Sequence, residues 1–222
     1  MSTTTVKTII DRVKNQLLET TTEGVRWNNE ELLGWLNDFY QFACMHLPDR
    51  FADVRTFTCV AGTRQDLPAD MEQLLDVIRN KDGNLRAVRK VERRMLDQTR
   101  PEWHSETAST VQEGWCFDDM YPKVFFVTPP ASAGSTLEIS GSVVPTAHPI
   151  GDYDDATTTI KCPDNMAPAS IDYILSRSYG KDADYSGNAQ REQNSMNRCL
   201  NALGLSQQIQ FKSSPNNPDN DR

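Results

Sequence analysis

Residues 27–60, WNNEELLGWLNDFYQFACMHLPDRFADVRTFTCV, decide the fold, because the spacing of apolar residues changes within them from helical to extended. Asn28 is a good helix N-cap, and Glu31 follows three residues later, as in a capping box. Apolar residues then recur at helical spacing as far as Pro48, which ends the predicted helix. From about residue 53 onward apolar and polar residues alternate, which predicts a half-buried strand. The stretch therefore marks the border between a helical and a β-rich part of the chain.

Helical periodicity is otherwise confined to the two ends of the sequence. Residues 6–17 carry one apolar stripe, and residues 171–179 and 196–203 carry two more, the last closed by Gly204 at a C-cap position. Between them the pattern predicts a short helix and several strands, with an Asp-Gly hairpin turn at 80–84. The strands are expected at 54–60, 74–79, 85–91, 115–118, 123–127 and 136–144, and the short helix at 93–99.

The expected fold class is α+β, because strands and helices do not alternate along the chain as a parallel βαβ winding requires. A discontinuous bundle of about four helices comes from residues 1–50 and 163–205. A small antiparallel β-rich domain, residues 51–162, is inserted into it. Residues 206–222 contain little apolar mass, so no isolated core could order them, and they are expected to form an extended C-terminal tail.

Composition narrows the class of protein. The 222 residues carry a formal charge of −8, which argues against a global electrostatic grip on nucleic acid or an anionic membrane. No apolar run approaches the roughly 20 residues of a membrane span. Five scattered cysteines without a CxxC motif are typical of reduced thiols. We expect a soluble, intracellular, acidic protein.

Motifs for catalysis and cofactor binding are missing from the sequence. It contains no GxSxG, HExxH, GxGxxG or GxxxxGK[ST] pattern, and His46, His104 and His148 have no local catalytic signature. Asp118 and Asp119 are adjacent and are interpreted as turn formers. The sequence therefore predicts no enzyme, no catalytic residue, no cofactor and no metal.

The acidic turn Asp182–Gly187 supports an alternative function. It matches the first half of an EF-hand loop, with oxygen ligands at positions 1, 3 and 5 and glycine at position 6. The twelfth position is Gln193, so the bidentate glutamate is lacking. A turn that caps the next helix is the simpler reading, but a small enzyme or metal-dependent factor using this turn remains the alternative. Asp152–Asp155, a second acidic cluster, is interpreted as a solvated loop.

Residues 79–100 depart from the overall charge. They hold eight basic and three acidic side chains, a local +5 that leaves about −13 on the remaining 200 residues. A solvated hairpin face explains such a run, but so does a docking surface for an acidic partner or a neighbouring copy. The candidate interface residues in this run are Arg86, Arg89, Lys90, Arg93 and Arg94.

Several short motifs together are similar to a known family. They are RWNNEELLGWLND (26–38), AGTRQDLP (61–68), LDVIRN (75–80), LD (96–97) with PEWH (101–104), and YPKVFFVTPP (121–130). In this order they resemble the head–tail adaptor proteins of tailed bacteriophages, a group that includes the tail tubular protein A type of short-tailed phages.

The resemblance implies a structural virion protein at the head–tail interface, made in the host cytoplasm. Such adaptors form a ring, usually of twelve copies, below the portal. The helical bundle packs copy to copy, the β-rich insertion faces the tail tube or nozzle protein, and the C-terminal segment grips the portal. Genomic DNA passes through the channel during ejection without specific binding, as an acidic lining would allow. Within the tail, Phe211 is the expected portal anchor, flanked by Ile209 and Lys212.

Overall fold

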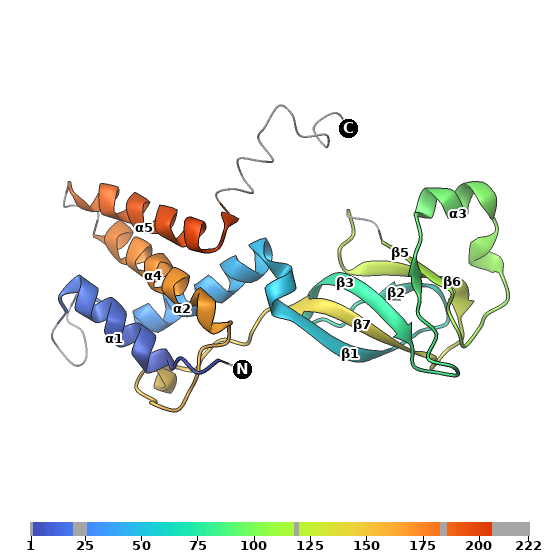
Figure 1. Cartoon of the computed structure of the whole chain (residues 1–222), viewed down its shortest axis with the longest axis horizontal. Helices are drawn as coiled ribbons and strands as arrows, with labels where there is room; N and C mark the ends of the chain where they lie inside the picture. Colours follow the sequence, from blue (N-terminus) through green and yellow to red (C-terminus); the bar gives the residue numbers. More distant parts are fainter. Residues whose placement is uncertain (1, 20–25, 118–119, 183–185, 206–222) are drawn as a thin grey trace. The chain divides into compact units, whose positions relative to one another are not determined.

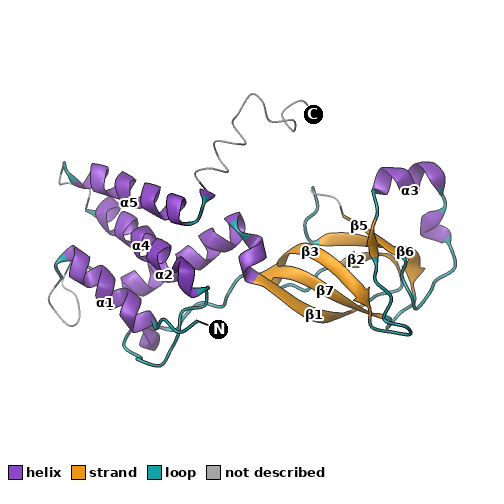
Figure 2. Cartoon of the chain, in the orientation of Figure 1, coloured by secondary structure: helices purple, strands orange, loops and turns teal. Residues whose placement is uncertain are grey.

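The structure, a computed structural model, has an α+β fold with five helices and two sheets in the part of the chain that it describes. The described residues are 2–19, 26–117, 120–182 and 186–205. By its contacts the chain divides into two compact units, residues 1–46 with 145–222, and residues 47–144. Figures 1 and 2 show that the first is built from helices and the second mainly from strands.

The helical unit is organised around one buried helix. Its helices are α1 (Val6–Leu17), α2 (Asn29–His46), α4 (Ala167–Lys181) and α5 (Asn188–Ala202). Helix α4 contacts the other three, and Ala169 and Ile174 on it are fully buried. Helices predicted at both chain ends are thus confirmed, and both ends contribute to one core. Gly204 follows α5 with φ +73°, the left-handed conformation expected of a residue just beyond a helix.

The start of α2 follows the predicted cap in part. The Asn28 side-chain oxygen accepts a hydrogen bond from the Glu30 N–H at 3.1 Å, as an N-cap residue does. Glu31 does not complete a capping box: its carboxylate instead accepts from Lys181 Nζ at 2.6 Å, at the end of α4. The ion pair therefore ties the first turn of α2 to the last turn of α4.

The β-rich unit contains two sheets that share one core. A three-stranded sheet has the order β1-β7-β3, and a four-stranded sheet the order β2-β6-β5-β4. The strands are β1 (Ala52–Thr58), β2 (Gly62–Asp66), β3 (Met71–Asn80), β4 (Arg89–Lys90), β5 (Gly114–Phe117), β6 (Val124–Ala131) and β7 (Thr136–Val143). Buried side chains of both sheets form the core, and Phe57 of β1 lies 5.5 Å from Phe125 of β6, ring centre to ring centre.

Consecutive residues on β5 and on β6 belong to two different hydrophobic clusters. Trp115 and Phe125 point into the core between the sheets. The next residue on each strand, Cys116 and Phe126, belongs to a second cluster with Trp103 and with Leu96 of α3 (Arg93–Thr99). Side chains alternate across a strand, so the four-stranded sheet is packed on both faces. The predicted helix at 93–99 is confirmed, and it covers the outer face of this sheet.

The predicted hairpin of residues 74–79 with 85–91 is wrong for its second half. Strand β3 pairs with β7, and the returning chain makes only one bridge to it, Arg79 to Ala87, before β4 joins the other sheet parallel to β5. The buried Asn80 explains the departure. Its side chain bonds the Arg86 and Gln112 carbonyl oxygens and the Gln112 N–H, at 2.8–2.9 Å. These bonds hold residues 86 and 112 beside the end of β3, so the chain leaves the first sheet there and continues into β4 of the second sheet.

Residues 145–163, named the return segment below, lead from β7 back to the helices. By its contacts this segment belongs to the helical unit, which resumes at residue 145. The sequence pattern had predicted that the β-rich part extends to residue 162 and that the helical part resumes at residue 163. The segment carries no apolar periodicity that assigns it to either side. Polar contacts fix it: Thr5 and Thr159 form a β-bridge, and the Asp164 carboxylate just beyond the segment accepts bonds from Ser2, Thr3 and Thr4.

Candidate interaction surfaces

The predicted basic interface residues lie on β4, on α3 and in the turn before β4. Arg86, Arg89, Lys90, Arg93 and Arg94 are all exposed. Strand β4 is the edge strand of its sheet, so its outer backbone groups have no neighbouring strand. The charged side chains of Arg89 and Lys90 on this edge disfavour pairing with a strand of another chain. Arg93 and Arg94 form the first turn of α3.

Some of these charges are paired within the chain. Arg86 lies 3.4 Å from Glu113, and Arg93 lies 3.7 Å from Asp97. In the same basic run, Arg79 pairs with Glu138 at 2.6 Å and lowers the pKa of that carboxyl. Within the described residues, no ion pair is found for Arg89, Lys90 or Arg94. The net positive charge is thus concentrated on β4 and the start of α3.

Aromatic rings and one apolar side chain accompany these charges. Lys90 Nζ lies 5.5 Å from the centre of the Trp115 ring, and the Arg93 guanidinium lies 5.4 Å from the centre of the Phe126 ring. Next to Arg94, Met95 is 54% exposed. Arginine and methionine are both enriched in protein interfaces, where lysine is depleted. The surface combines positive charge with apolar area.

The predicted portal-docking residues Ile209, Phe211 and Lys212 lie outside the described residues, which end at Leu205. Asp118 and Asp119 likewise lie outside them.

The acidic turn at Asp182–Gly187 is described only at its ends, since residues 183–185 lie outside the described part. Asp182 has both carboxylate oxygens engaged: one pairs with Arg26, and the other accepts from Asn188 Nδ2 at 2.7 Å. The latter bond, with a second one from Asn188 to the Asp182 carbonyl at 2.8 Å, ties the turn to the first residue of α5. A cation would have to displace the Arg26 guanidinium.

A pocket of about 310 Å³ lies beside this turn. Arg26 and Arg191 line it, each stacked on an aromatic ring, at 5.1 Å from Trp27 and 5.8 Å from Tyr179. Two guanidinium groups at its wall make it unsuited to a cation. Among the described residues, no group of three or more His, Cys, Asp and Glu side chains is placed to hold a metal ion.

A buried polar cluster went unnoticed in the sequence. His148 is buried, and its ring nitrogens lie 2.9 Å from Asp152 and 3.1 Å from the Tyr40 hydroxyl. The prediction of a solvated loop at Asp152–Asp155 is therefore wrong for Asp152. Asp155 accepts bonds from Thr157 and Thr158, which lower its pKa to about 2. The sequence offered one sign of this cluster, namely that Asp152 follows His148 by four residues.

The helices of the described segments include none with both the length and the apolar character that crossing a membrane demands. The chain matches the family described as SU10 adaptor protein over residues 4–219 and belongs to that family. This confirms the resemblance to phage head–tail adaptors, and it makes the chain a phage adaptor, a structural kind of protein. Among curated proteins, none matches it.

Proposed function

We propose that the chain is the head–tail adaptor of a tailed phage, and that copies of it form a ring that joins the portal to the tail. The family match over residues 4–219 carries this proposal. In the proposed organisation a discontinuous helical bundle, with the β-rich unit inserted, packs copy to copy. The ring has twelve copies, and its role is non-enzymatic.

The test is to mix the purified chain with a portal ring and to image the product by electron microscopy. A ring of extra density on one face of the portal is expected. Portal rings that remain bare at micromolar chain concentration would contradict the proposal.

Residues 206–222 are the proposed portal-docking segment, with Phe211 as the anchor between Ile209 and Lys212. Its low apolar content supports a segment that orders on a partner. Deleting 206–222 should leave the melting temperature of the isolated chain nearly unchanged and abolish portal binding. Phe211→Ala should weaken binding strongly, whereas Asn216→Ala is the matched control. Undiminished portal affinity of the truncated chain would remove this assignment.

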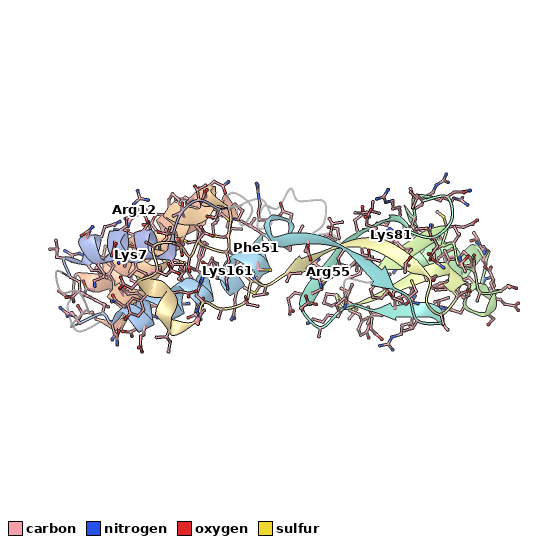
Figure 3. All side chains as sticks on the ribbon, turned by 90° about the horizontal axis from the view of Figure 1, so that it is seen from below. Lys7, Arg12, Phe51, Arg55, Lys81 and Lys161 are labelled. Carbon is pink, nitrogen blue, oxygen red and sulfur yellow. The ribbon has the colours of Figure 1, made fainter. Side chains whose placement is uncertain are left out.

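The basic residues on β4 and α3 are the proposed contact with an acidic neighbour, either a second copy or a tail component. Reversing Arg89, Lys90 and Arg94 to Glu should abolish ring or tail assembly, because these three charges have no ion pair within the described chain. Arg12→Glu on α1, in the other unit (Figure 3), is the single-charge control. Assembly that survives the triple reversal would assign these residues to protection of the sheet edge instead.

Genomic DNA is proposed to pass through the ring without specific binding. The formal charge of −8 supports this, since a negative surface repels a duplex. A mobility-shift assay at physiological salt should show no tight complex between the isolated chain and duplex DNA. A shift that disappears on reversal of Arg89, Lys90 and Arg94 would show that the basic surface binds nucleic acid.

A further inference from the structure

The return segment lies on the helical unit through its 3-10 turn η3 (Ile150–Tyr153), which contacts both α1 and α2. It begins directly after residues 144–145, where the chain crosses from the β-rich unit back to the helical unit. The segment is mainly polar, and its buried apolar side chains, Ile160 and Cys162, lie near its C-terminal end. What attaches it to α2 is a set of hydrogen bonds centred on His148.

His148 is held on four sides. Its backbone N–H donates to Asn37 Oδ1 at 2.8 Å, and its carbonyl accepts from Asn37 Nδ2 at 3.3 Å. Its Nδ1 lies 2.9 Å from Asp152 Oδ2, and its Nε2 lies 3.1 Å from the Tyr40 hydroxyl. Both side chains that α2 contributes to this cluster, Asn37 and Tyr40, therefore engage the same residue of the return segment.

The partners fix where the protons lie. An ionised carboxylate only accepts, so Nδ1 must carry a hydrogen that it donates to Asp152. The Tyr40 oxygen already accepts from the Lys161 N–H at 3.2 Å, and its own hydrogen has Nε2 as acceptor. With neutral His148 every member of the chain Asp152–His148–Tyr40 is satisfied. Protonation at Nε2 would turn that nitrogen into a donor and leave the buried Tyr40 hydrogen without its acceptor.

We propose that the chain Asp152–His148–Tyr40 is an acid-sensitive latch that holds the return segment on α2 while His148 is neutral and releases it when His148 is protonated. This inference does not depend on the adaptor function.

The charged groups around the latch lie on the return segment and on α1, and α2 contributes the titratable Tyr40. Asp152 belongs to η3, Lys161 lies further along the segment beside the buried Cys162, and Lys7 of α1 pairs with Asp154. Figure 3 shows Lys7 and Lys161. Burial lowers the pKa of His148, Asp152 opposes this, and Lys161 lowers it further. Burial raises the pKa of Tyr40 well above its usual value, so the hydroxyl keeps its proton at neutral pH.

The direction of the pH effect follows from these pKa shifts. The released segment takes up a proton at the ordinary histidine pKa of 6.5, whereas the latched form resists it. The latch is therefore fully stable above about pH 6.5 and weakens as the pH falls toward the lowered pKa. Asp155 and Asp164, which tie neighbouring residues, have strongly lowered pKa values and stay ionised through this range.

The test is hydrogen exchange on the full chain, expressed as protection factors at about pH 7.5 and about pH 5.0 so that intrinsic exchange cancels. In the wild type, protection of amides 146–162 should fall severalfold at the lower pH, while that of α4 stays constant. His148→Gln should lower protection of the same amides at the higher pH and abolish its pH dependence. His46→Gln, at the exposed end of α2, is the matched control and should behave as the wild type.

Histidine NMR of the wild type decides the matter if His148→Gln fails to fold. The expected state at about pH 7.5 is the neutral ring with its hydrogen on Nδ1, titrating below the ordinary histidine pKa. Three results would each overturn the proposal. The first is a neutral His148 ring with its hydrogen on Nε2, and the second is constant protection of residues 146–162 between the two pH values. The third is a loss of protection on acidification that is as large in His148→Gln as in the wild type.

Discussion

Individual polar side chains fix the parts of this chain that have no periodic structure. Asp164 shows this most clearly, because its carboxylate accepts from the Ser2 and Thr3 hydroxyls and from the N–H groups of Thr3 and Thr4. These bonds lie just before the cap of α1, where the Thr5 hydroxyl accepts from the Thr8 N–H at 3.2 Å. One carboxylate thus aligns the start of the first helix with residues about 160 positions away in the sequence.

Asp164→Asn should lower the melting temperature at neutral pH, because an amide has one oxygen acceptor where the carboxylate has two. The bonds hold the pKa of Asp164 well below its usual range, so their stabilisation is complete above about pH 4 and is lost as the pH falls. The difference in melting temperature between the two proteins should therefore shrink on acidification from about pH 7 to about pH 2. Thermal melts across this range measure it, with Asp11→Asn on α1 as the control. Equal melting temperatures at neutral pH would show that the cluster contributes nothing.

At the scale of elements, two glycines differ in the space around them, one in helix α2 and one in strand β7. In α2, a Cβ at Gly34 would meet nothing within 4 Å. In β7, a Cβ at Gly141 would lie 2.7 Å from Met71 Sδ and 3.0 Å from the Gln73 carbonyl oxygen of β3. A methyl side chain therefore fits at Gly34 of the helix but not at Gly141 of the strand.

The same substitution should therefore have opposite effects at these two glycines. Gly34→Ala should stabilise the chain by about 0.5–1 kcal/mol, since glycine costs that much in a helix interior. Gly141→Ala should destabilise it by about 1–3 kcal/mol, because Met71 and the β3 backbone must move. Urea denaturation of both variants checks this. Destabilisation by Gly34→Ala would show that α2 needs glycine for a reason other than space.

The helices could be predicted because each carries its own periodicity, as in residues 6–17, and because Asn28 caps α2 as expected. Strand β2 was missed because Gly62–Asp66 contains neither the alternation nor the aromatic residues of a typical strand. It is held by Gln65, whose buried side chain bonds the backbone of Val60 and Gly62. The bonds of Asn80 with Gln112 and of His148 with Tyr40 join residues that are distant in the sequence, so no local pattern reveals these partners.

At the scale of the whole molecule, we expect the β-rich unit, residues 47–144, to fold independently. Its two sheets enclose a core of their own. Its first strand pairs directly with its last, with Ala52 opposite Ser142, so the two ends of the unit lie side by side. A unit with adjacent ends can be inserted into another without distorting either.

Residues 47–144 expressed alone should unfold in a single cooperative transition. Residues 1–46 alone should show little stable helix, because the apolar faces of α1 and α2 are covered by α4 in the intact chain. Circular dichroism during thermal unfolding distinguishes the two fragments. Non-cooperative melting of fragment 47–144 would mean that its core depends on the helical unit.

The dependence of α1 and α2 on α4 affects how the chain is made. Some 120 residues separate the end of α2 from the start of α4, so on the ribosome the first two helices wait roughly 6–24 s for their partner. During that time the apolar faces of α1 and α2 are exposed, while the β-rich unit, which is synthesised after α2 and before α4, can already fold. Nascent chains stalled before α4 should therefore recruit chaperones through their first 46 residues, and a slower translation rate should lower the yield of native product.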